Sequence, residues 1–246
     1  MTEGSLAGRM AALGGLGPYF AVDLHPPGSP VCPPWQPFGE LISAPGALAA
    51  RIGEVRARLA AAAGCAADDV EFRVAASVAQ LGLCARLLSP VLGAAAAGWA
   101  LSVDAARTRW VPALGGPFRL SLSEPAAGDS TPRDGTSACL SLLAGPVAQI
   151  TRAVEAMAVS PQVLWGNVAS AVSGAAVMIA RTRPDLSAPA AAAAVAMLRD
   201  PALAGTCRGS PGAAFRRRNC CLIYRLSPPG PARYCGDCVL GQGLDA

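Results

Sequence analysis

Four cysteines near the C-terminus have the residue type and the spacing to bind a metal centre. They are Cys220, Cys221, Cys235 and Cys238, so an adjacent pair is followed by a CxxC motif within 19 residues. Thiolates are the ligands that both Zn²⁺ and iron–sulfur clusters prefer. The sequence therefore predicts a metal site in this segment, with all four thiolates as ligands.

The order of the cysteines favours a binuclear centre over a single ion. The two thiolates of a CxxC converge across a tight turn, and Gly236 permits such a turn. Neighbouring side chains of an extended segment point to opposite faces, so Cys220 and Cys221 are poorly placed to bind the same tetrahedral ion. Two irons bridged by sulfide offer separate positions. We therefore favour a [2Fe–2S] cluster, with zinc and free or redox-active thiols as the alternatives.

The rest of the chain shows no second organised site. Its only histidine, His25, precedes two prolines and is expected at the surface. The odd number of nine cysteines argues against a disulfide framework. The start of the chain, residues 1–17, lacks the basic and long apolar regions of a secretory signal, so we expect a cytoplasmic protein with reduced thiols. The five remaining cysteines are scattered and are expected to be small buried residues, outside the metal site: Cys32, Cys65, Cys84, Cys139 and Cys207.

The elements that must position the cysteines are mostly helical. The apolar content of 52% with 15% charged residues excludes wholesale disorder. Apolar spacing and breakers predict helices over residues 46–63, 74–88, 147–157, 161–181 and 187–199. Weaker alternation predicts strands at 98–103 and 118–122, which would pair, and at 69–74 and 222–226. The apolar run 163–180 contains polar residues and is expected to be a core helix, so no stable membrane insertion is predicted.

The fold class predicted from these elements is α+β. A helix-dominant body with a few short antiparallel strands is followed by a cysteine-rich [2Fe–2S] segment. We expect an irregular Gly/Pro-rich leader over residues 1–40, the helical body over 41–205, and the C-terminal [2Fe–2S]-binding segment over 206–246. Residues 124–137 are rich in Gly, Asp, Ser, Thr and Pro and are expected to form a long exposed loop.

The cysteine segment resembles the C-terminal signature of the FhuF-type ferric-siderophore reductases. The resemblance rests on Cys220-Cys221-Leu-Ile-Tyr-Arg-Leu, on Cys235-Gly-Asp-Cys238, and on the preceding Arg217-Arg218-Asn219. Upstream, residues 85–93 and Leu164-Trp165-Gly166-Asn167 are similar to the helical body of that family, so the likeness covers roughly residues 70–240. One departure is the 13 residues between Cys221 and Cys235, which is more than the family pattern has.

The resemblance implies a [2Fe–2S] cluster held by the four cysteines, and a reaction that needs no catalytic residue beyond the cluster. That reaction is the one-electron reduction of Fe³⁺ bound to a siderophore, of the hydroxamate class, which releases Fe²⁺. No flavin or nicotinamide motif is visible, so a separate protein is expected to donate the electron. The alternatives are a non-enzymatic zinc-stabilised binding module, or an iron–sulfur electron carrier or sensor.

The cysteine segment also carries the positive charge. Residues 206–246 contain six arginines against two aspartates, which is the whole net charge of +4. These arginines either solvate a surface tail or offset the negative cluster and attract an acidic donor or an anionic ferric chelate. The patch is small and poor in aromatic residues, so nucleic-acid binding is not expected. The candidates for a contact with the cluster or a docking partner are Arg217, Arg218, Arg225, Arg233 and Tyr224.

Overall fold

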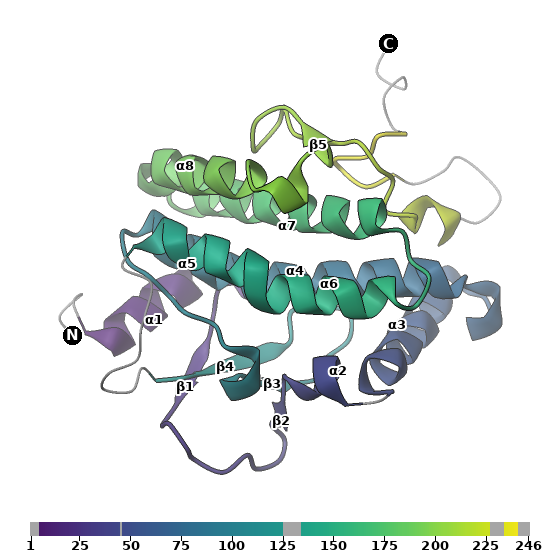
Figure 1. Ribbon diagram of the computed structural model, residues 1–246, viewed down its shortest axis with the longest axis horizontal. Coiled ribbons are helices and arrows are strands. Elements are labelled where there is room, and N and C mark those ends of the chain that lie inside the picture. Colours follow the sequence, from purple (N-terminus) through teal and green to yellow (C-terminus); the bar gives the residue numbers. More distant parts are fainter. Residues whose placement is uncertain (1–4, 45, 125–133, 227–233, 241–246) are drawn as a thin grey trace.

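The computed structural model describes residues 5–44, 46–124, 134–226 and 234–240. Figure 1 shows α5 and α6 in front of α4, with α7 and α8 along one side of it and a small sheet along the other. The helix-dominant α+β class predicted from the sequence is confirmed. The α-helices are α1 (Leu6–Gly15), α2 (Glu40–Ser43), α3 (Ala47–Ala63), α4 (Phe72–Ala96), α5 (Gly135–Leu142), α6 (Ala148–Glu155), α7 (Pro161–Thr182) and α8 (Ser187–Leu198).

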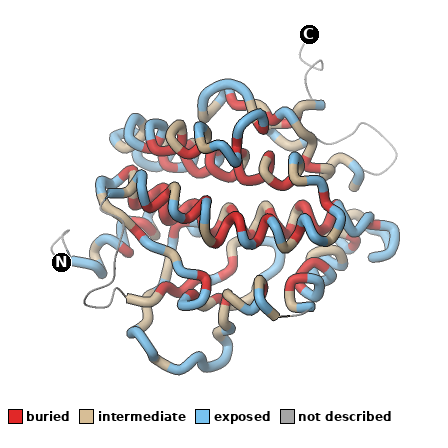
Figure 2. Tube along the Cα trace, in the orientation of Figure 1, coloured by how far each residue is buried: buried red, intermediate tan, exposed pale blue. Residues whose placement is uncertain are grey.

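Helix α4 is the centre of the body. It packs against α3, α5, α7 and α8, and Figure 2 shows the buried positions that run through this group. Most of its residues are apolar and most are buried, which is the pattern of a helix enclosed by others. Prediction ended this helix before Pro90, but it continues to Ala96. Packing on both sides of Pro90 outweighs the one backbone hydrogen bond that proline removes.

Residues 5–40, predicted as an irregular leader, contain α1, β1 and β2, while the residues between these elements form neither helix nor strand. Ser5 caps α1, and Met10, Leu13 and Leu16 recur at a helical spacing and are buried. A Cβ at Gly93 of α4 would lie 2.9 Å from Leu13 Cδ2, so α1 approaches α4 closely at this glycine. The many Gly and Pro residues of the segment hid this short amphipathic pattern. The proposed boundaries at residues 40/41 and 205/206 stay predictions.

The sheet differs from the predicted hairpin in its partners. Its order is β1 (Asp23–His25), β4 (Arg119–Ser123), β3 (Arg109–Val111) and β2 (Gln36–Pro37). The prediction of a strand at 118–122 agrees with β4, but β4 pairs with β3 and not with residues 98–103, which form no strand. The pairing of β1 with β4 is parallel and joins distant parts of the chain. Trp110 on β3 is buried between Phe38 and Phe118, whose ring centroids lie 6.1 Å and 5.3 Å away.

Two other predicted strands are helical. Residues 69–74 form the end of a 3₁₀ turn, Ala67–Asp69, and the start of α4. Residues 222–226 contain a second 3₁₀ turn, Ile223–Leu226. Of the long loop predicted at 124–137, residues 125–133 lie outside the described part of the chain, and α5 begins at Gly135 after the Asp134 cap.

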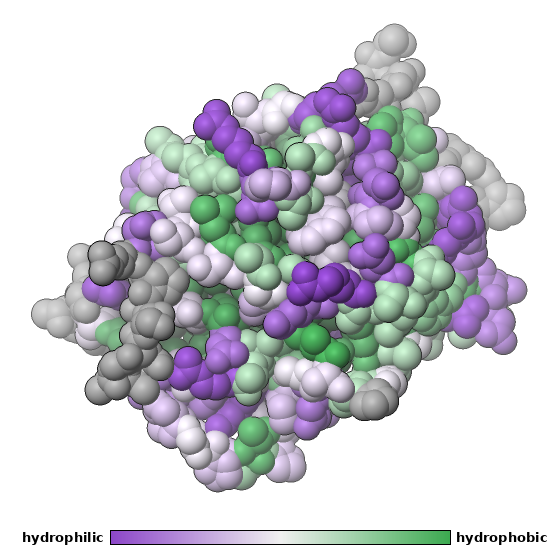
Figure 3. Space-filling view, viewed as in Figure 1, coloured by the Kyte–Doolittle hydropathy of each residue, from purple (hydrophilic) through white to green (hydrophobic). Residues whose placement is uncertain are grey.

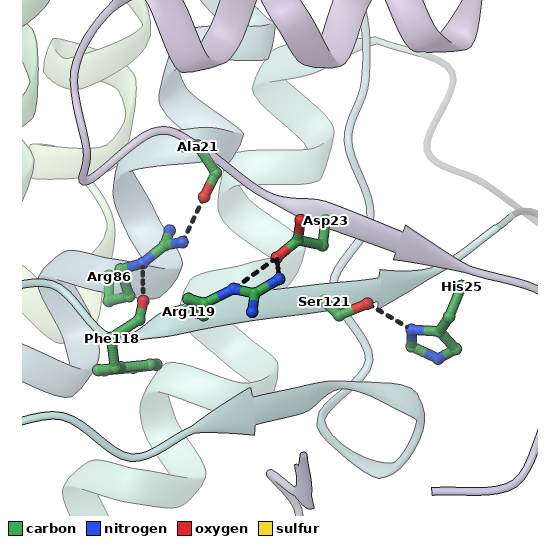
Figure 4. Close-up of polar contacts among 7 residues, drawn as sticks. All are labelled: Ala21, Asp23, His25, Arg86, Phe118, Arg119 and Ser121. Atoms are coloured by element: carbon green, nitrogen blue, oxygen red, sulfur yellow. Dashed lines mark hydrogen bonds and ion pairs between the residues drawn. The ribbon is translucent and has the colours of Figure 1, made fainter. Parts of the chain in front are cut away.

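The junction between α4 and the sheet is fixed by one buried arginine (Figure 4). The Arg86 guanidinium donates to three main-chain carbonyls, those of Phe118, Tyr19 and Ala21. At the edge of the same sheet His25 Nδ1 lies 2.7 Å from Ser121 Oγ. Burial and the charge of Arg109 lower the pKa of His25. The only histidine therefore serves the sheet, on the side of α4 that faces away from the cysteine segment in Figure 1.

Three helical stretches are long and apolar enough to cross a membrane, if only length and composition are considered. They are Phe72–Ala96, Gly135–Glu155 and Pro161–Thr182. Between 56% and 78% of the most apolar part of each is buried inside the described structure. The run 163–180 lies within α7, at the position where a core helix was predicted.

Candidate metal centre

The cysteine segment lies over α7 and the first turns of α4. Its base is a two-stranded ribbon in which β5 (Cys207–Arg208) pairs with β6 (Arg216–Arg217). Strand β6 contacts α7, and the 3₁₀ turn Ile223–Leu226 contacts α3 and α4. Figure 1 shows this segment on the far side of the helices from the sheet. The ribbon therefore holds the cysteines against the two central helices of the body.

The structure brings one pair of the predicted ligands into contact and places all four in the same segment. The Sγ atoms of Cys221 and Cys235 lie 3.5 Å apart. The main-chain N–H of Leu222 donates to Cys220 Sγ, and that of Leu240 donates to Cys238 Sγ, both at 3.3 Å. Cys221 and Cys238 are buried, whereas Cys220 and Cys235 are half-buried. Backbone donors aimed at sulfur are a usual environment of iron–sulfur thiolates and help to set their reduction potential.

The arrangement fits a binuclear cluster better than one zinc ion. Among the described residues, no group of three or more His, Cys, Asp or Glu side chains is close enough to hold a single metal ion. The four thiols are all described, so they do not converge on one tetrahedral point. One thiol pair is in contact and the other two thiols lie in the same segment, so the donor set is that of an iron–sulfur cluster with four cysteine ligands. These four residues would hold such a cluster.

The thiols of this segment differ electrostatically from those of the core. A proton shared with Cys235 lowers the pKa of Cys221 to about 6, and the N–H of Ile223 and the charge of Arg217 act in the same direction. The same sharing raises the pKa of Cys235. Burial raises the pKa of Cys84 to about 12, and burial together with the charge of Asp134 raises the pKa of Cys139 to about 12. Burial also raises the pKa of Cys220, so the segment favours a thiolate at Cys221, while the core keeps its thiols protonated.

The five scattered cysteines were expected to be buried. This prediction is confirmed for Cys84 and Cys139 and wrong for Cys32 and Cys65, which are exposed, and Cys207 is half-buried.

Arg217 is not a solvated tail residue. It is 1% exposed, and its Nη2 donates to Asn167 Oδ1 at 2.5 Å and to the Val163 carbonyl at 3.2 Å, both on α7. A Cβ at Gly166 would lie 3.1 Å from this nitrogen, so the glycine makes room for the guanidinium. The segment Trp165-Gly166-Asn167 was noticed in the sequence only as part of the resemblance. The structure gives two of its residues a task beside the cysteines.

A buried polar chain connects Arg217 to α4. Asn167 Nδ2 donates to the Ser77 carbonyl, to Ser77 Oγ and to Gln80 Oε1 at 2.9–3.0 Å. Ser77 Oγ in turn donates to the Cys221 carbonyl at 2.9 Å. Ser77 and Gln80 were not predicted as site residues. Their partners lie far away in the sequence, 144 residues from Ser77 to Cys221 and 87 residues from Gln80 to Asn167, and a serine or glutamine in an apolar helix does not indicate such a partner.

The other candidate residues have different surroundings. Arg218 is exposed. Arg225 donates to Glu71 at 2.6 Å and lies over the ring of Tyr224, which is half-buried. Hydrogen bonds from Arg225 and Arg73 lower the pKa of Glu71. Arg233 lies outside the described residues.

Comparison with known proteins agrees with this geometry. None of the curated proteins matches the chain. Residues 217–240 match the family model of the FhuF 2Fe-2S C-terminal domain, a range that begins at the buried arginine and contains all four cysteines. The match points to a [2Fe–2S] cluster and indicates an iron–sulfur protein. The resemblance of this segment to the FhuF-type family is thereby confirmed: residues 217–240 are related to its 2Fe-2S C-terminal domain.

Proposed function

We propose that this protein is a cytoplasmic ferric-siderophore reductase, which reduces chelated Fe³⁺ by one electron and so releases Fe²⁺. The observation that carries the proposal is the set of four thiols held in a segment that matches a 2Fe-2S domain. When bound, the cluster supplies reversible one-electron chemistry. Hard oxygen chelators bind Fe³⁺ far more tightly than the softer Fe²⁺, so a single electron frees the metal and leaves the chelator intact.

The cysteine segment has one edge that faces solvent. Cys220 and Cys235 are half-buried, whereas Cys221 and Cys238 are enclosed. A chelate or a donor protein that docks at this edge reaches the site over the shortest distance. No proton transfer is required, in agreement with a histidine that lies in the sheet. The roles of the chain are to hold the cluster, shield one side of it and present the other.

Charge at this edge would select the partner. Arg218 is exposed beside the cysteines, while the charge of Arg225 is offset by Glu71. In Figure 3 hydrophilic residues cover much of the surface near the C-terminal end of the described chain. We propose an acidic electron-donor protein and a ferric hydroxamate siderophore as the partners. A lipid bilayer is not proposed as a stable partner, because the apolar helices are mostly buried inside the protein. Nucleic acid is not proposed either, because the basic patch is small.

The test mixes the chemically reduced holoprotein with a ferric hydroxamate and a ferrous trap, anaerobically. We expect the cluster to reoxidise and Fe²⁺ to appear in step, in a ratio of one electron to one iron. The variant R218Q should slow the reaction with an anionic chelate more at low salt than at high salt. The reason is that dissolved salt screens the attraction between an exposed arginine and an anion. An exposed arginine outside the cysteine segment, Arg152 on α6, provides the matched control R152Q.

A cluster that stays reduced with hydroxamate and catecholate chelates alike would overturn the reductase proposal. An electron carrier or sensor would then be the better description. Iron, sulfide and zinc analysis of anaerobically purified protein separates both from the zinc-stabilised module, which would be colourless and free of sulfide.

A further inference from the structure

Arg217 is a buried cation without an anionic partner among the described residues. Every described ion pair of the chain involves other arginines. Its Nη2 is bound to a neutral amide and a neutral carbonyl, and its Nε is the one buried side-chain nitrogen or oxygen of the described residues that has no hydrogen-bond partner. A buried charge that lacks a counter-charge costs several kcal/mol. The fold therefore contains a site that favours an added negative charge.

Arg217 lies three residues before Cys220, and its main chain contacts the CxxC turn. The main-chain N–H of Arg217 donates to the carbonyl of Asp237, the residue before Cys238, at 3.1 Å. Arg217 is thus tied to the cysteine segment at two points of the chain, through the strand before Cys220 and through the CxxC turn.

The body holds the guanidinium in one position. Gly166 leaves the space that the guanidinium occupies, since a Cβ there would approach Nη2 to 3.1 Å. Asn167 binds Nη2 through its oxygen and binds Ser77 and Gln80 through its nitrogen, so it is itself held by α4. A charge fixed by a second layer of hydrogen bonds acts on its neighbour more strongly than a mobile one.

We propose that Arg217 is the buried counter-charge of the [2Fe–2S] cluster. As a positioning residue it makes the cluster easier to reduce, because reduction adds one negative charge beside a fixed positive one. It also couples cluster loading to folding, because loading supplies the anion that the buried cation lacks. The inference rests on the cluster of the proposed function, and it is independent of whether a siderophore is the oxidant.

The experiment compares R217Q with R218Q in the holoprotein. Both variants remove one positive charge from adjacent positions, one buried and one exposed. The cluster is titrated with dithionite and redox mediators, without any siderophore, and its paramagnetic spectrum is recorded after reduction by one electron. We expect R217Q to weaken the reduced form relative to the oxidised form about tenfold, which lowers the potential by ~59 mV for one electron. R218Q should shift the potential much less, and R217K, which keeps the charge, should lie between wild type and R217Q.

Equal potentials and equal spectra for R217Q and R218Q would overturn the proposal. If R217Q retains no cluster, the unfolding temperatures of the R217Q and wild-type apoproteins distinguish a counter-charge from a purely structural residue. A counter-charge predicts that apo R217Q is at least as stable as the wild-type apoprotein, because an unpaired buried cation has been removed. An apo R217Q that unfolds at a clearly lower temperature would assign Arg217 a structural role only. The variant G166A, which keeps the arginine but fills its space, should lower the potential in the same direction as R217Q.

Discussion

Arg86 at the sheet junction and Arg217 at the cysteine segment are both almost completely buried, at 2% and 1% exposure, but their surroundings differ. Nε, Nη1 and Nη2 of Arg86 each donate to a main-chain carbonyl, and its ring neighbour is Phe118. Burial lowers the pKa of Arg86 to about 10. Arg217 makes two side-chain hydrogen bonds and leaves Nε unused. All three side-chain nitrogens of Arg86 therefore have an acceptor, whereas Nε of Arg217 has none among the described residues.

This difference in hydrogen-bond partners distinguishes Arg86, which has a structural role, from Arg217, which has room for a ligand. Three carbonyls accept from Nε, Nη1 and Nη2 of Arg86 and bring together residues 19–21, α4 and Phe118, the residue before β4. Nothing is missing there. Around Arg217 the two neutral partners leave the buried Nε–H without an acceptor in the described part of the chain, so the surroundings of this arginine still have room for an anionic partner. Burial alone does not distinguish the two, but the count of satisfied donors does.

Removing one of the proposed cluster ligands should separate the two regions most clearly. We expect C238S to lose the visible absorption of the cluster completely, because a buried thiolate ligand is replaced by a weaker hydroxyl. The helical body, fixed by Arg86, should keep its far-ultraviolet circular dichroism. The control is C207S on β5, which should retain the cluster. A native spectrum in C238S would remove this residue from the ligand set.

Removing Arg86 should have the opposite effect. In R86M three carbonyls lose their donors, and each buried unsatisfied group costs about 1–3 kcal/mol, so the free energy of unfolding should fall by about 3 kcal/mol or more. The potential of any cluster that remains in the folded protein should equal that of wild type. Urea unfolding and a redox titration measure the two quantities. A stability unchanged in R86M would show that these hydrogen bonds contribute little.

The hydroxyl that links α4 to the cysteine segment should have an intermediate effect. Ser77 Oγ donates to the Cys221 carbonyl and accepts from Asn167, so S77A should cost about 1–2 kcal/mol of unfolding free energy. The matched control is S89A on the same helix, whose hydroxyl only donates to the Ala85 carbonyl one turn earlier. Equal losses in the two variants would refute a role of Ser77 in anchoring the segment.

The smallest effect is expected from His25, on the Arg86 side. Burial and Arg109 lower its pKa, so below about pH 6.5 the unfolded chain binds more protons than the folded one. Stability should therefore fall as the pH falls from 6.5 through the lowered pKa, and H25Q should reduce this dependence. The cluster potential of H25Q should match wild type at each pH. A steeper acid loss in H25Q than in wild type would contradict the sign.

Local signals in the sequence were sufficient for several elements. The helix predicted at 46–63 is α3, and Gly64 ends it with a φ of 69°. Ser160 and Pro161 begin α7 as predicted, although the Ser160 side chain makes no capping bond. The pairing of β1 with β4 and the passage of α4 through Pro90 depend on packing between distant segments, and no local pattern contains that information. The same limit applies to the elements that were assigned to 98–103 and 222–226.

The candidate site shows the same division. The cysteines are close in sequence, so their spacing alone identified a metal segment. Their support is assembled from far away: Asn167 is 50 residues from Arg217, and Ser77 is 144 residues from Cys221. An arginine in a basic run has no feature that distinguishes a buried counter-charge from a solvated side chain. Only the fold separates Arg217 from Arg218.

The hydrogen bond from the Arg217 N–H to the Asp237 carbonyl has a consequence for how this domain can vary between proteins. This hydrogen bond joins the strand before Cys220 to the CxxC turn. A second one, from the Cys238 N–H to the Cys235 carbonyl, closes the CxxC turn itself. The length of the connection between Cys221 and Cys235 therefore does not by itself set the distance between the two cysteine pairs. Lengthening such a connection by a few residues costs only about 0.2 kcal/mol of closure entropy. The 13 residues between Cys221 and Cys235 are therefore compatible with the same cluster geometry as a shorter span, and this stretch is a natural place for insertions, tags or reporters.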